Sequence, residues 1–502
     1  MKRHKATMAV QVTFAALLAG TGLACAAPAD ADGPTLDRFY SQPLQWKSCD
    51  DSRLDPAGAQ CADITVPLNY SEPQGETITV AISRMAATDP AQRRGVMLSN
   101  SGGPGGPGLD FMVDVSAAMA PDVRARYDLI GMDPRGVGRS SPLDCHWPRG
   151  FGLQSAGIDA VGFAESVATQ GDLAARCAAA EGERLRYFTT RNTARDMDVI
   201  RAALGAEKAS YFGTSYGTYL GAVFTQMFPE RSDRIVLDSS VDPDRYGAVG
   251  MMQDMGPINE AALDLWADFV AADDGEYHFG ATRDQVRGTM LDLIRRAAAD
   301  PIRLGEYAVD EHTLPMMLFV GLDDPRNYEK LAGQIRQVAD AAEGKPVEIA
   351  PELDTMLSFM LDAKPRDSSA QMAIMCGDVA TPRDPALYWR NIEAARAAQP
   401  VFGAFANNIT PCAFWAPPAE APTQVRNAVP ALIVQSTGDT RTTHQGAVAM
   451  RRDLSASRMV TLQDVPIHWI FGNYPNTCTY DVVNTYLRDG TLPAADVTCR
   501  AD

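Results

Sequence analysis

Three residues whose types cooperate in acyl transfer stand far apart in this sequence: Ser215, Asp439 and His468. Ser215 is the centre of Gly213-Thr-Ser-Tyr-Gly217, a G-x-S-x-G pentapeptide. This pattern is typical of a sharp strand-to-helix turn with the serine at its tip, because glycines two residues to either side leave room for the turn. A strand-like run precedes the pentapeptide and an amphipathic stretch follows it. The sequence therefore predicts that Ser215 is a nucleophile.

A serine hydroxyl needs a base to accept its proton, and the base needs an acid to orient it. Asp439 follows an apolar run at residues 432–436, and His468 follows the next strand-like run, in the recurrent order of serine, acid and histidine. We therefore expect Asp439 to be the acid and His468 the base. The alternatives are a turn aspartate and a packed histidine. The other histidines lie in the N-terminal segment, before the serine, in a helical segment or directly after Asp439: His4, His146, His278, His312 and His444.

A glycine-rich loop, Asn-Ser-Gly-Gly-Pro-Gly-Gly-Pro-Gly, occupies residues 100–108 after a short apolar run. Such a loop brings backbone N–H groups close to a reacting carbonyl group. We expect the N–H groups of Gly103 and Tyr216 to form an oxyanion hole, which stabilises the charge that develops during acyl transfer. The rival interpretation is a phosphate-binding loop, but the Lys-Ser/Thr pair that such a loop needs does not follow.

The elements that must position these residues alternate between strand and helix up to about residue 242. Strand-like runs occupy residues 62–68, 77–85, 96–99, 127–132, 210–214 and 234–238, and a helix is expected over residues 192–204, capped by Asn192 or Thr193 and ended by Gly205. Residues 243–424 are mainly helical in periodicity, and strand-like runs return at 430–436 and 459–463. This pattern predicts an α/β-hydrolase fold, a mostly parallel sheet flanked by helices, with an inserted helical cap.

We therefore divide the chain into an N-terminal segment, 1–26, a first core part, 27–242, the cap insertion, 243–424, and a second core part, 425–502. The N-terminal segment is typical of an export signal, with Lys2, Arg3 and Lys5 before an apolar stretch and Ala24-Cys-Ala26 as a cleavage site. Secretion is the expectation, and lipid anchoring through Cys25 is the less favoured alternative. Since no later apolar run is long enough to cross a bilayer, we expect no stable membrane insertion.

The cysteines agree with export. The eight that remain after residue 26 form four local couples, and closing short loops predicts disulfides Cys49–Cys61, Cys145–Cys177, Cys376–Cys412 and Cys478–Cys499. A metal site is the rival interpretation, but no C-x-x-C or H-x-x-x-H spacing supports it. We expect neither a metal nor a cofactor.

The formal net charge is −18, with 22% charged residues. An acidic chain without a Lys/Arg cluster has little with which to hold a phosphate backbone, so nucleic acid is not an expected partner. The charge serves solubility, or part of it attracts cationic ligands such as peptide amino groups. The expected partner is a peptide or a small-molecule substrate, bound by a monomer.

With these motifs in place, the chain resembles secreted bacterial tripeptidyl aminopeptidases and their proline iminopeptidase relatives. The matching segments occur in the right order and are spread over most of the mature chain: residues 101–108, 133–140, 213–217, 229–231, 376–378, Asp439 and 486–499. The resemblance implies a helical cap over the active site and cleavage of short peptides from a free N-terminus. It also implies acidic cap residues that hold the substrate's α-ammonium group. Asp378 is the candidate for that role, with a structural carboxylate beside the Cys376 disulfide as the alternative.

The chain departs from these relatives beside the histidine, where Ile467 and Trp469 replace the usual glycines, and in the Asn-Ser start of the glycine-rich loop. Bulky residues at 467 and 469 are expected to narrow or reshape the pocket. The leading hypothesis is a serine exopeptidase acting through an acyl-enzyme. The second is an esterase or amidase with the same three residues and a small-molecule substrate, and the third is an inactive hydrolase used as a cell-surface binding module.

Overall fold

The computed structural model describes residues 35–362 and 368–502. A nine-stranded sheet is its centre, in the order β1-β2-β4-β3-β5-β6-β9-β10-β11. From β4 to β11 all neighbouring strands are parallel, and β2 pairs antiparallel with both β1 and β4. The strands are β1 (Gln60–Pro67), β2 (Thr77–Met85), β3 (Gly95–Asn100), β4 (Tyr127–Met132), β5 (Ala209–Thr214), β6 (Ser232–Asp238), β9 (Ala431–Ser436), β10 (Arg458–Gln463) and β11 (Val497–Arg500).

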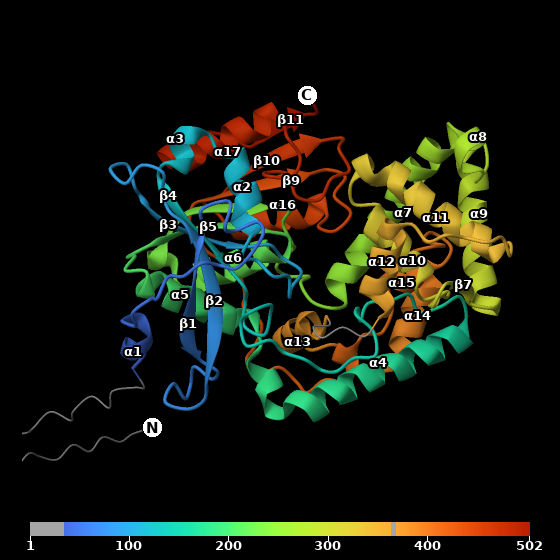
Figure 1. Cartoon of the computed structure of the whole chain (residues 1–502), viewed down its shortest axis with the longest axis horizontal. Coiled ribbons are helices and arrows are strands. Elements are labelled where there is room, and N and C mark those ends of the chain that lie inside the picture. Colours follow the sequence, from blue (N-terminus) through green and yellow to red (C-terminus); the bar gives the residue numbers. More distant parts are fainter. Residues whose placement is uncertain (1–34, 363–367) are drawn as a thin grey trace, which may run out of the picture.

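Helices cover both faces of this sheet (Figure 1). One face packs on α5 (Thr190–Ala203), α6 (Tyr216–Met227) and α16 (His444–Asp453), and the other on α2 (Phe111–Ala118), α3 (Pro121–Arg124) and α17 (Thr477–Asp489). Successive side chains of a strand point to opposite faces of the sheet. In β6, Ile235 and Leu237 therefore pack against the helices of the first face, and Val236 packs against those of the second. The short α1 (Asp37–Tyr40) lies against the first face through Phe39. The predicted α/β-hydrolase fold is confirmed.

The chain between β6 and β9 forms a mainly helical insertion, beside the sheet in Figure 1, with a hydrophobic core of its own around Leu263 and Trp266. Its elements are α7 (Gly250–Ala271), α8 (Asp274–Tyr277), α9 (Arg283–Ala299), β7 (Ile302–Leu304), β8 (Tyr307–Val309), α10 (Leu314–Gly321), α11 (Tyr328–Ala342), α12 (Pro351–Leu361), α13 (Ser369–Asp378), α14 (Pro385–Ala395) and α15 (Gly403–Ala406). The β7–β8 hairpin was not predicted.

One helix from the first part of the chain joins this insertion. It is α4 (Ala160–Glu181), which runs along the lower side of the insertion in Figure 1. Its Phe163 packs with Tyr388 and Ile392 of α14. The insertion is therefore supported by a segment that precedes the nucleophile by several dozen residues, and sequence patterns alone did not predict that helix.

Local predictions were right about position and wrong about one cap. The predicted helix at 192–204 is α5, but it begins at Thr190, because the Thr189 hydroxyl accepts a hydrogen bond from Asn192 N at 3.3 Å. Asn192 and Thr193, the predicted caps, lie inside the first turn. An N-cap side chain accepts a hydrogen bond from the backbone N–H group two or three residues later. Thr189 is the side chain that does so here, and the helix therefore begins at the next residue, Thr190.

The four predicted disulfides are all present: Cys49–Cys61, Cys145–Cys177, Cys376–Cys412 and Cys478–Cys499. Among the described residues no cluster of His, Cys, Asp and Glu could hold a metal ion, and none of their helices is long and apolar enough to span a membrane. The predictions for residues 1–26, including cleavage near Cys25, lie outside the described residues.

Candidate active site

Ser215 stands at the turn between the end of β5 and the start of α6, as predicted from its pentapeptide. Its backbone lies in the left-handed region, with φ 58°. A Cβ atom on Gly213 would lie 2.4 Å from the Gly217 carbonyl oxygen, and one on Gly217 would lie 2.4 Å from the Asn100 carbonyl oxygen. Both glycines are therefore required by close packing, and the serine side chain is left at the tip of the turn, partly exposed.

The structure brings Asp439 and His468 together. His468 Nδ1 lies 3.0 Å from each carboxylate oxygen of Asp439. Asp439 is fully buried after β9 and also accepts hydrogen bonds from Arg441 N, from Thr442 N and from the Thr442 hydroxyl, at 2.8–2.9 Å. A carboxylate held in this way orients the ring, so that Nδ1 carries the proton and Nε2 can accept one.

The same contacts shift both titrations. Burial by itself raises the pKa of Asp439, but the charge of His468 and the hydrogen bonds outweigh it and hold the pKa below its ordinary 3.8. Burial by itself lowers the pKa of His468, and the Asp439 charge and hydrogen bond outweigh it, so that the pKa is raised above its ordinary 6.5. The pair therefore favours an imidazolium ion beside a carboxylate, the state that a general base reaches after accepting a proton.

Ser215 and His468 lie on neighbouring loops, but in the described structure no hydrogen bond joins Ser215 Oγ to the His468 ring. Both loops are attached to the end of β6. Ser215 N donates to the Asp238 carbonyl at 3.0 Å, and Trp469 N donates to the Ser239 hydroxyl at 2.9 Å. Hydrogen bonds between nucleophile and base commonly form only when substrate is bound, so this arrangement suits a free enzyme.

Asp238, which the sequence places only at the end of a strand, connects these two loops. It is fully buried, and its carboxylate accepts hydrogen bonds from Phe471 N at 2.7 Å and from Ile470 N at 3.2 Å. Burial raises its pKa from 3.8 to about 7, against these hydrogen bonds and the nearby charge of His468. An acidic residue at the carboxyl end of a parallel strand was the one sequence signal that could have revealed it.

The glycine-rich loop lies against the nucleophile. A Cβ atom on Gly102 would lie 2.8 Å from Ser215 Cβ, and Gly102 N donates to Asn100 Oδ1 at 3.0 Å. The next N–H, on the exposed Gly103, and the N–H of Tyr216 donate to no other group in the part of the chain that the structure describes. Two unoccupied donors beside the nucleophile are what an oxyanion hole requires.

Asp133 holds this loop in place from the end of β4. Its two carboxylate oxygens accept hydrogen bonds from Gly108 N and Arg139 N, both at 2.8 Å. The motif Asp-Pro-Arg-Gly at 133–136 therefore braces the far end of the glycine-rich loop rather than contacting the nucleophile.

The contacts of Asp378 favour the structural alternative over the predicted role of holding a substrate ammonium group. It ends α13 and is buried, and its carboxylate accepts hydrogen bonds from Thr190 N at 2.8 Å, from the Thr190 hydroxyl at 2.5 Å and from the Tyr246 hydroxyl at 3.0 Å. The Thr190 hydroxyl also lies 2.6 Å from the Tyr216 hydroxyl. Burial raises the pKa of Asp378 to about 7. With three donors already around it, this carboxylate is a structural link between α13 and the start of α5.

Of the two bulky residues beside His468, Ile467 does not act as expected. Ile467 is fully buried in the core, so its side chain cannot narrow a pocket. Trp469 has φ 65°, in the region that favours glycine. Its ring packs 5.4 Å from the Phe111 ring, and its indole N–H donates to the Phe471 carbonyl at 2.8 Å. These contacts hold a strained residue in place.

The insertion contacts the loops that carry the acid and the base. His468 N donates to the Asp323 carbonyl at 3.2 Å, and Asn259 Nδ2 donates to the Thr440 carbonyl at 2.8 Å. The Arg441 guanidinium lies 3.7 Å from the centre of the Phe319 ring. The insertion therefore covers this side of the site and restricts which molecules can approach the nucleophile.

Comparison with known proteins agrees with this geometry. Residues 96–323 match a family model described as alpha/beta hydrolase fold, and residues 399–499 match one described as TAP-like protein. The chain is 35% identical over 479 residues to the tripeptidyl aminopeptidase of Streptomyces lividans, which covers 91% of this chain and 86% of that protein. It is 27% identical to the serine protease Hip1 of Mycobacterium tuberculosis, over 91% of each chain. It is also 28% identical to carboxylesterase B of the same species, over 99% of each chain.

Proposed function

The chain belongs to the tripeptidyl aminopeptidase family of α/β-hydrolases and is a serine peptidase, and from this premise we propose that it is a secreted exopeptidase releasing short peptides from free N-termini. In this proposal Ser215 is the nucleophile, His468 the base and Asp439 the acid. The observation that carries it is the buried Asp439–His468 pair, with both oxygen-to-nitrogen distances at 3.0 Å, beside a serine at a strained turn.

The reaction follows from these positions. His468 Nε2 accepts the proton of the Ser215 hydroxyl as its oxygen attacks the scissile carbonyl, and the Asp439 carboxylate stabilises the imidazolium that forms. The negative charge on the carbonyl oxygen is stabilised by the N–H groups of Gly103 and Tyr216, and losing one such donor typically costs about 3–4 kcal/mol. His468 then protonates the leaving amine. In the second half of the reaction His468 accepts a proton from a water molecule as the water oxygen attacks the acyl carbonyl. The bond to Ser215 then breaks, and His468 returns the proton to the Ser215 oxygen.

Two observations support the finer parts of the proposal. The insertion contacts the acid loop through Asn259 and Phe319, so it covers part of the approach to the nucleophile, which favours small or flexible substrates over folded ones. Four disulfides in one chain favour an oxidising compartment, and the predicted export signal supports secretion.

The test uses Ala-Ala-Pro anilides with free and acetylated N-termini, against the wild type and Ser215→Ala. We expect the wild type to cleave only the free-amine substrate and Ser215→Ala to cleave neither. Equal cleavage of both substrates would remove the requirement for a free N-terminus. Folding of Ser215→Ala is checked by its thermal unfolding, since the exchange removes one hydroxyl from a partly exposed side chain.

The second candidate is an ester hydrolase using the same three residues. It is favoured by the similarity to a carboxylesterase over 99% of both chains. Cleavage of simple nitrophenyl esters through Ser215, with no cleavage of either peptide anilide, would select this candidate instead.

A further inference from the structure

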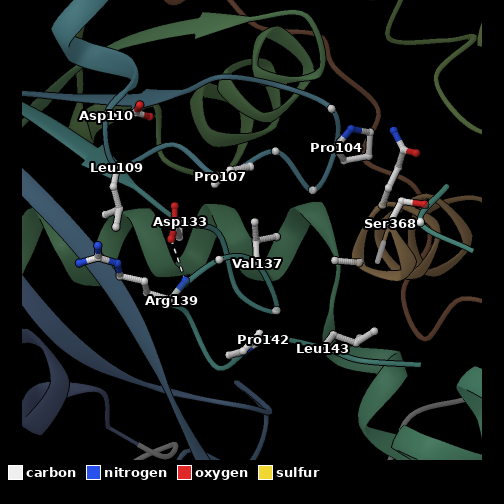
Figure 2. Close-up of a pocket in the computed structure, with 18 of the residues that line it drawn as sticks. Pro104, Pro107, Leu109, Asp110, Asp133, Val137, Arg139, Pro142, Leu143 and Ser368 are labelled. Carbon is white, nitrogen blue, oxygen red and sulfur yellow. Dashed lines mark hydrogen bonds between the residues drawn. The ribbon is translucent and has the colours of Figure 1, made fainter. Parts of the chain in front are cut away.

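The insertion meets the active site in two ways. Beside the glycine-rich loop it leaves a cavity of about 620 Å³, which is lined by Pro104 and Val137 of the core and by Ser368 at the start of α13 (Figure 2). Neither His468 nor Asp439 is among the described residues that line this cavity. On the side of the acid and the base, the insertion instead makes direct contacts, through the end of α10 and the turn that follows it.

The turn after α10, residues 322–327, holds the backbone of His468 from both sides. The Asp323 carbonyl accepts a hydrogen bond from His468 N at 3.2 Å. The Arg326 guanidinium donates to the Asn473 backbone carbonyl at 3.0 Å and to the Asn473 side-chain oxygen at 3.1 Å. The Asn473 amide group in turn donates to the His468 carbonyl at 3.3 Å. The N–H of His468 is therefore held by the insertion directly, and its carbonyl is held through Asn473.

Arg441 connects the end of α10 to the acid. Its backbone N–H donates to Asp439 at 2.8 Å, and its side chain, 13% exposed, reaches into the insertion. The guanidinium donates to the carbonyls of Phe319 and Val320, lies 3.7 Å from the centre of the Phe319 ring, and lies 3.7 Å from the Asp323 carboxylate. The last carbonyls of a helix have no partner within it and carry partial negative charge, so a cation is favourable there. A planar guanidinium can make all these contacts at once.

The end of α10 and its turn are fixed parts of the insertion. Met317 and Leu318 of α10 are fully buried in the core of the insertion. Within the turn, the Asp324 carboxylate accepts a hydrogen bond from Arg326 N at 2.9 Å and pairs with the Arg326 guanidinium at 2.5 Å. Because closely packed segments have few alternative positions, the place of the insertion decides where this turn holds His468.

The charges around the His468 ring come from three elements. Asp439 and Arg441 lie on the acid loop, Asp323 lies on the insertion, and Asp238 lies at the end of β6. The charges of Asp439 and Asp323 raise the pKa of His468, and the charge of Arg441 lowers it. The ion pair farther along the turn carries no net charge. Loss of the Arg441 charge therefore raises the pKa of His468 further, and loss of the Asp323 charge lowers it.

We propose that the insertion positions the general base, with Arg441 and the turn at residues 322–327 holding His468 where it can accept the proton of Ser215. This proposal rests on the roles given to the three residues under the proposed function, and it applies to peptide and ester substrates alike. Arg441, Asp323 and Arg326 are positioning residues, since they act through His468. The insertion is then needed even for a substrate too small to be selected by it.

The experiment measures hydrolysis of nitrophenyl acetate, whose acyl group is too small to need a binding pocket. Arg441→Met removes the guanidinium and its charge, whereas Arg441→Lys keeps a charge without the planar group. Arg336→Met is the matched control. Arg336 is 20% exposed, donates to the His278 carbonyl at 3.2 Å, pairs with Asp340 at 3.0 Å and lies 5.3 Å from the centre of the Phe279 ring, all within the insertion. Urea unfolding shows whether each variant is folded.

We expect Arg441→Met to lower kcat about 10- to 100-fold and to keep KM within about twofold, because a shift of about 1 Å in a positioned group acts on the transition state. Its activity should also decline at a higher pH than that of the wild type, since the pKa of His468 rises. Arg441→Lys restores the wild-type midpoint and only part of kcat. Asp323→Asn keeps the backbone carbonyl and moves the midpoint to lower pH. Arg336→Met keeps the wild-type kcat and midpoint.

Arg326→Ala tests the proposal from the other side of His468, and it decides alone if Arg441→Met does not fold. The Arg326 side chain is 45% exposed, so its removal leaves little empty space, but the hydrogen bonds to Asn473 are lost. We expect kcat to fall about 10-fold. Folded Arg441→Met and Arg326→Ala enzymes with wild-type kcat overturn the proposal. A loss of kcat in Arg336→Met as large as that in Arg441→Met overturns it too, because any disturbance of the insertion would then have the same effect.

These outcomes are distinct from failure of the proposed function. If Ser215→Ala hydrolyses nitrophenyl acetate at the wild-type rate, the roles given to the three residues fail, and this proposal fails with them. If Ser215→Ala is inactive and the wild type cleaves the ester but no peptide, only the exopeptidase function fails. The kcat of Arg441→Met on the ester then still decides whether the insertion positions His468.

Discussion

Asp238→Asn should slow catalysis much more than it destabilises the fold. Asp238 is buried at the end of β6, where its carbonyl oxygen accepts a hydrogen bond from Ser215 N and its carboxylate accepts hydrogen bonds from Ile470 N and Phe471 N. Asparagine keeps the shape and one acceptor oxygen, but its NH₂ group faces a backbone N–H. The loop that carries His468 therefore loses one of its attachments to the nucleophile turn.

The magnitudes follow from the two effects of the carboxylate. A hydrogen bond to a charged group contributes about 1.5–3 kcal/mol, and asparagine loses about one of them. Against this, burial raises the pKa of Asp238 from 3.8 to about 7. Because the folded pKa lies above the unfolded one, stability falls as pH rises from about 4 to about 7, by up to about 4 kcal/mol. Asparagine does not ionise, so above pH 7 the variant avoids the cost of charging the buried carboxyl group. That gain nearly cancels the loss of the hydrogen bond, and the net change in the free energy of unfolding is within about 2 kcal/mol.

Catalysis has no such compensation. A shift of about 1 Å in a positioned group can cost about 100-fold in rate, so we expect kcat to fall about 10- to 100-fold with a smaller change in KM. The assay measures kcat and KM on nitrophenyl acetate at pH 8, and urea unfolding at pH 5 and pH 8. The stability difference from wild type should depend on pH, since only the wild-type carboxylate titrates between these values.

Asp128→Asn is the matched control. Asp128 is also buried and accepts a hydrogen bond from a backbone N–H, that of Ala87 at 2.9 Å, and it pairs with Arg93 at 2.9 Å. It lies near the start of β4, at the amino end of the parallel strands, whereas Asp238 lies at their carboxyl end. It should change stability without changing kcat. A folded Asp238→Asn enzyme with wild-type kcat would show that the histidine loop is positioned without Asp238, and the reasoning would be refuted.

Three further predictions follow from the site and the insertion. Activity should decline as pH falls through a midpoint above 6.5, because the pKa of His468 is raised and only its neutral ring accepts a proton. Asp439→Asn should move that midpoint to lower pH and lower kcat about 10⁴-fold, and a pH–rate profile measures both effects. Gly102→Ala should lose about 2–5 kcal/mol in urea unfolding together with most esterase activity, since its φ is +100° and its Cβ would lie 2.7 Å from the Thr214 carbonyl oxygen; a fully active variant would contradict the loop geometry. Replacing both Cys376 and Cys412 by alanine should cost about 4 kcal/mol of stability by freeing a loop of 36 residues, measured by urea unfolding, and no loss would mean that other contacts hold the insertion.

Patterns within short stretches of sequence predicted the parts of this protein that depend on near neighbours. The Ser215 turn could be predicted because its two glycines lie within two residues of it, and the parallel strands β3 to β6, β9 and β10 because buried parallel strands are continuous apolar runs. The four disulfides could be predicted because each joins cysteines adjacent in the list of cysteines along the chain. The order of serine, acid and histidine follows from the fold that those strands imply.

Other features depend on which segments meet in space. Strand β11 and helix α4 were not predicted from the sequence, and they pack on β10 and on α14. Thr189 caps α5 although Asn192 and Thr193 are equally good cap residues by type, because capping depends on which side chain can reach the first N–H groups.

The roles of the buried acids were decided by tertiary structure alone. Asp238 ends a strand and Asp378 ends a helix, and neither position by itself says which groups the carboxylate will meet. The fold surrounds Asp378 with Thr190 and Tyr246, far along the chain, and places Asp238 under the histidine loop. The cavity beside Gly103 likewise exists only where the core and the insertion meet. A carboxylate's function is set by the donors and the solvent around it, and these come from residues that the chain brings together only on folding.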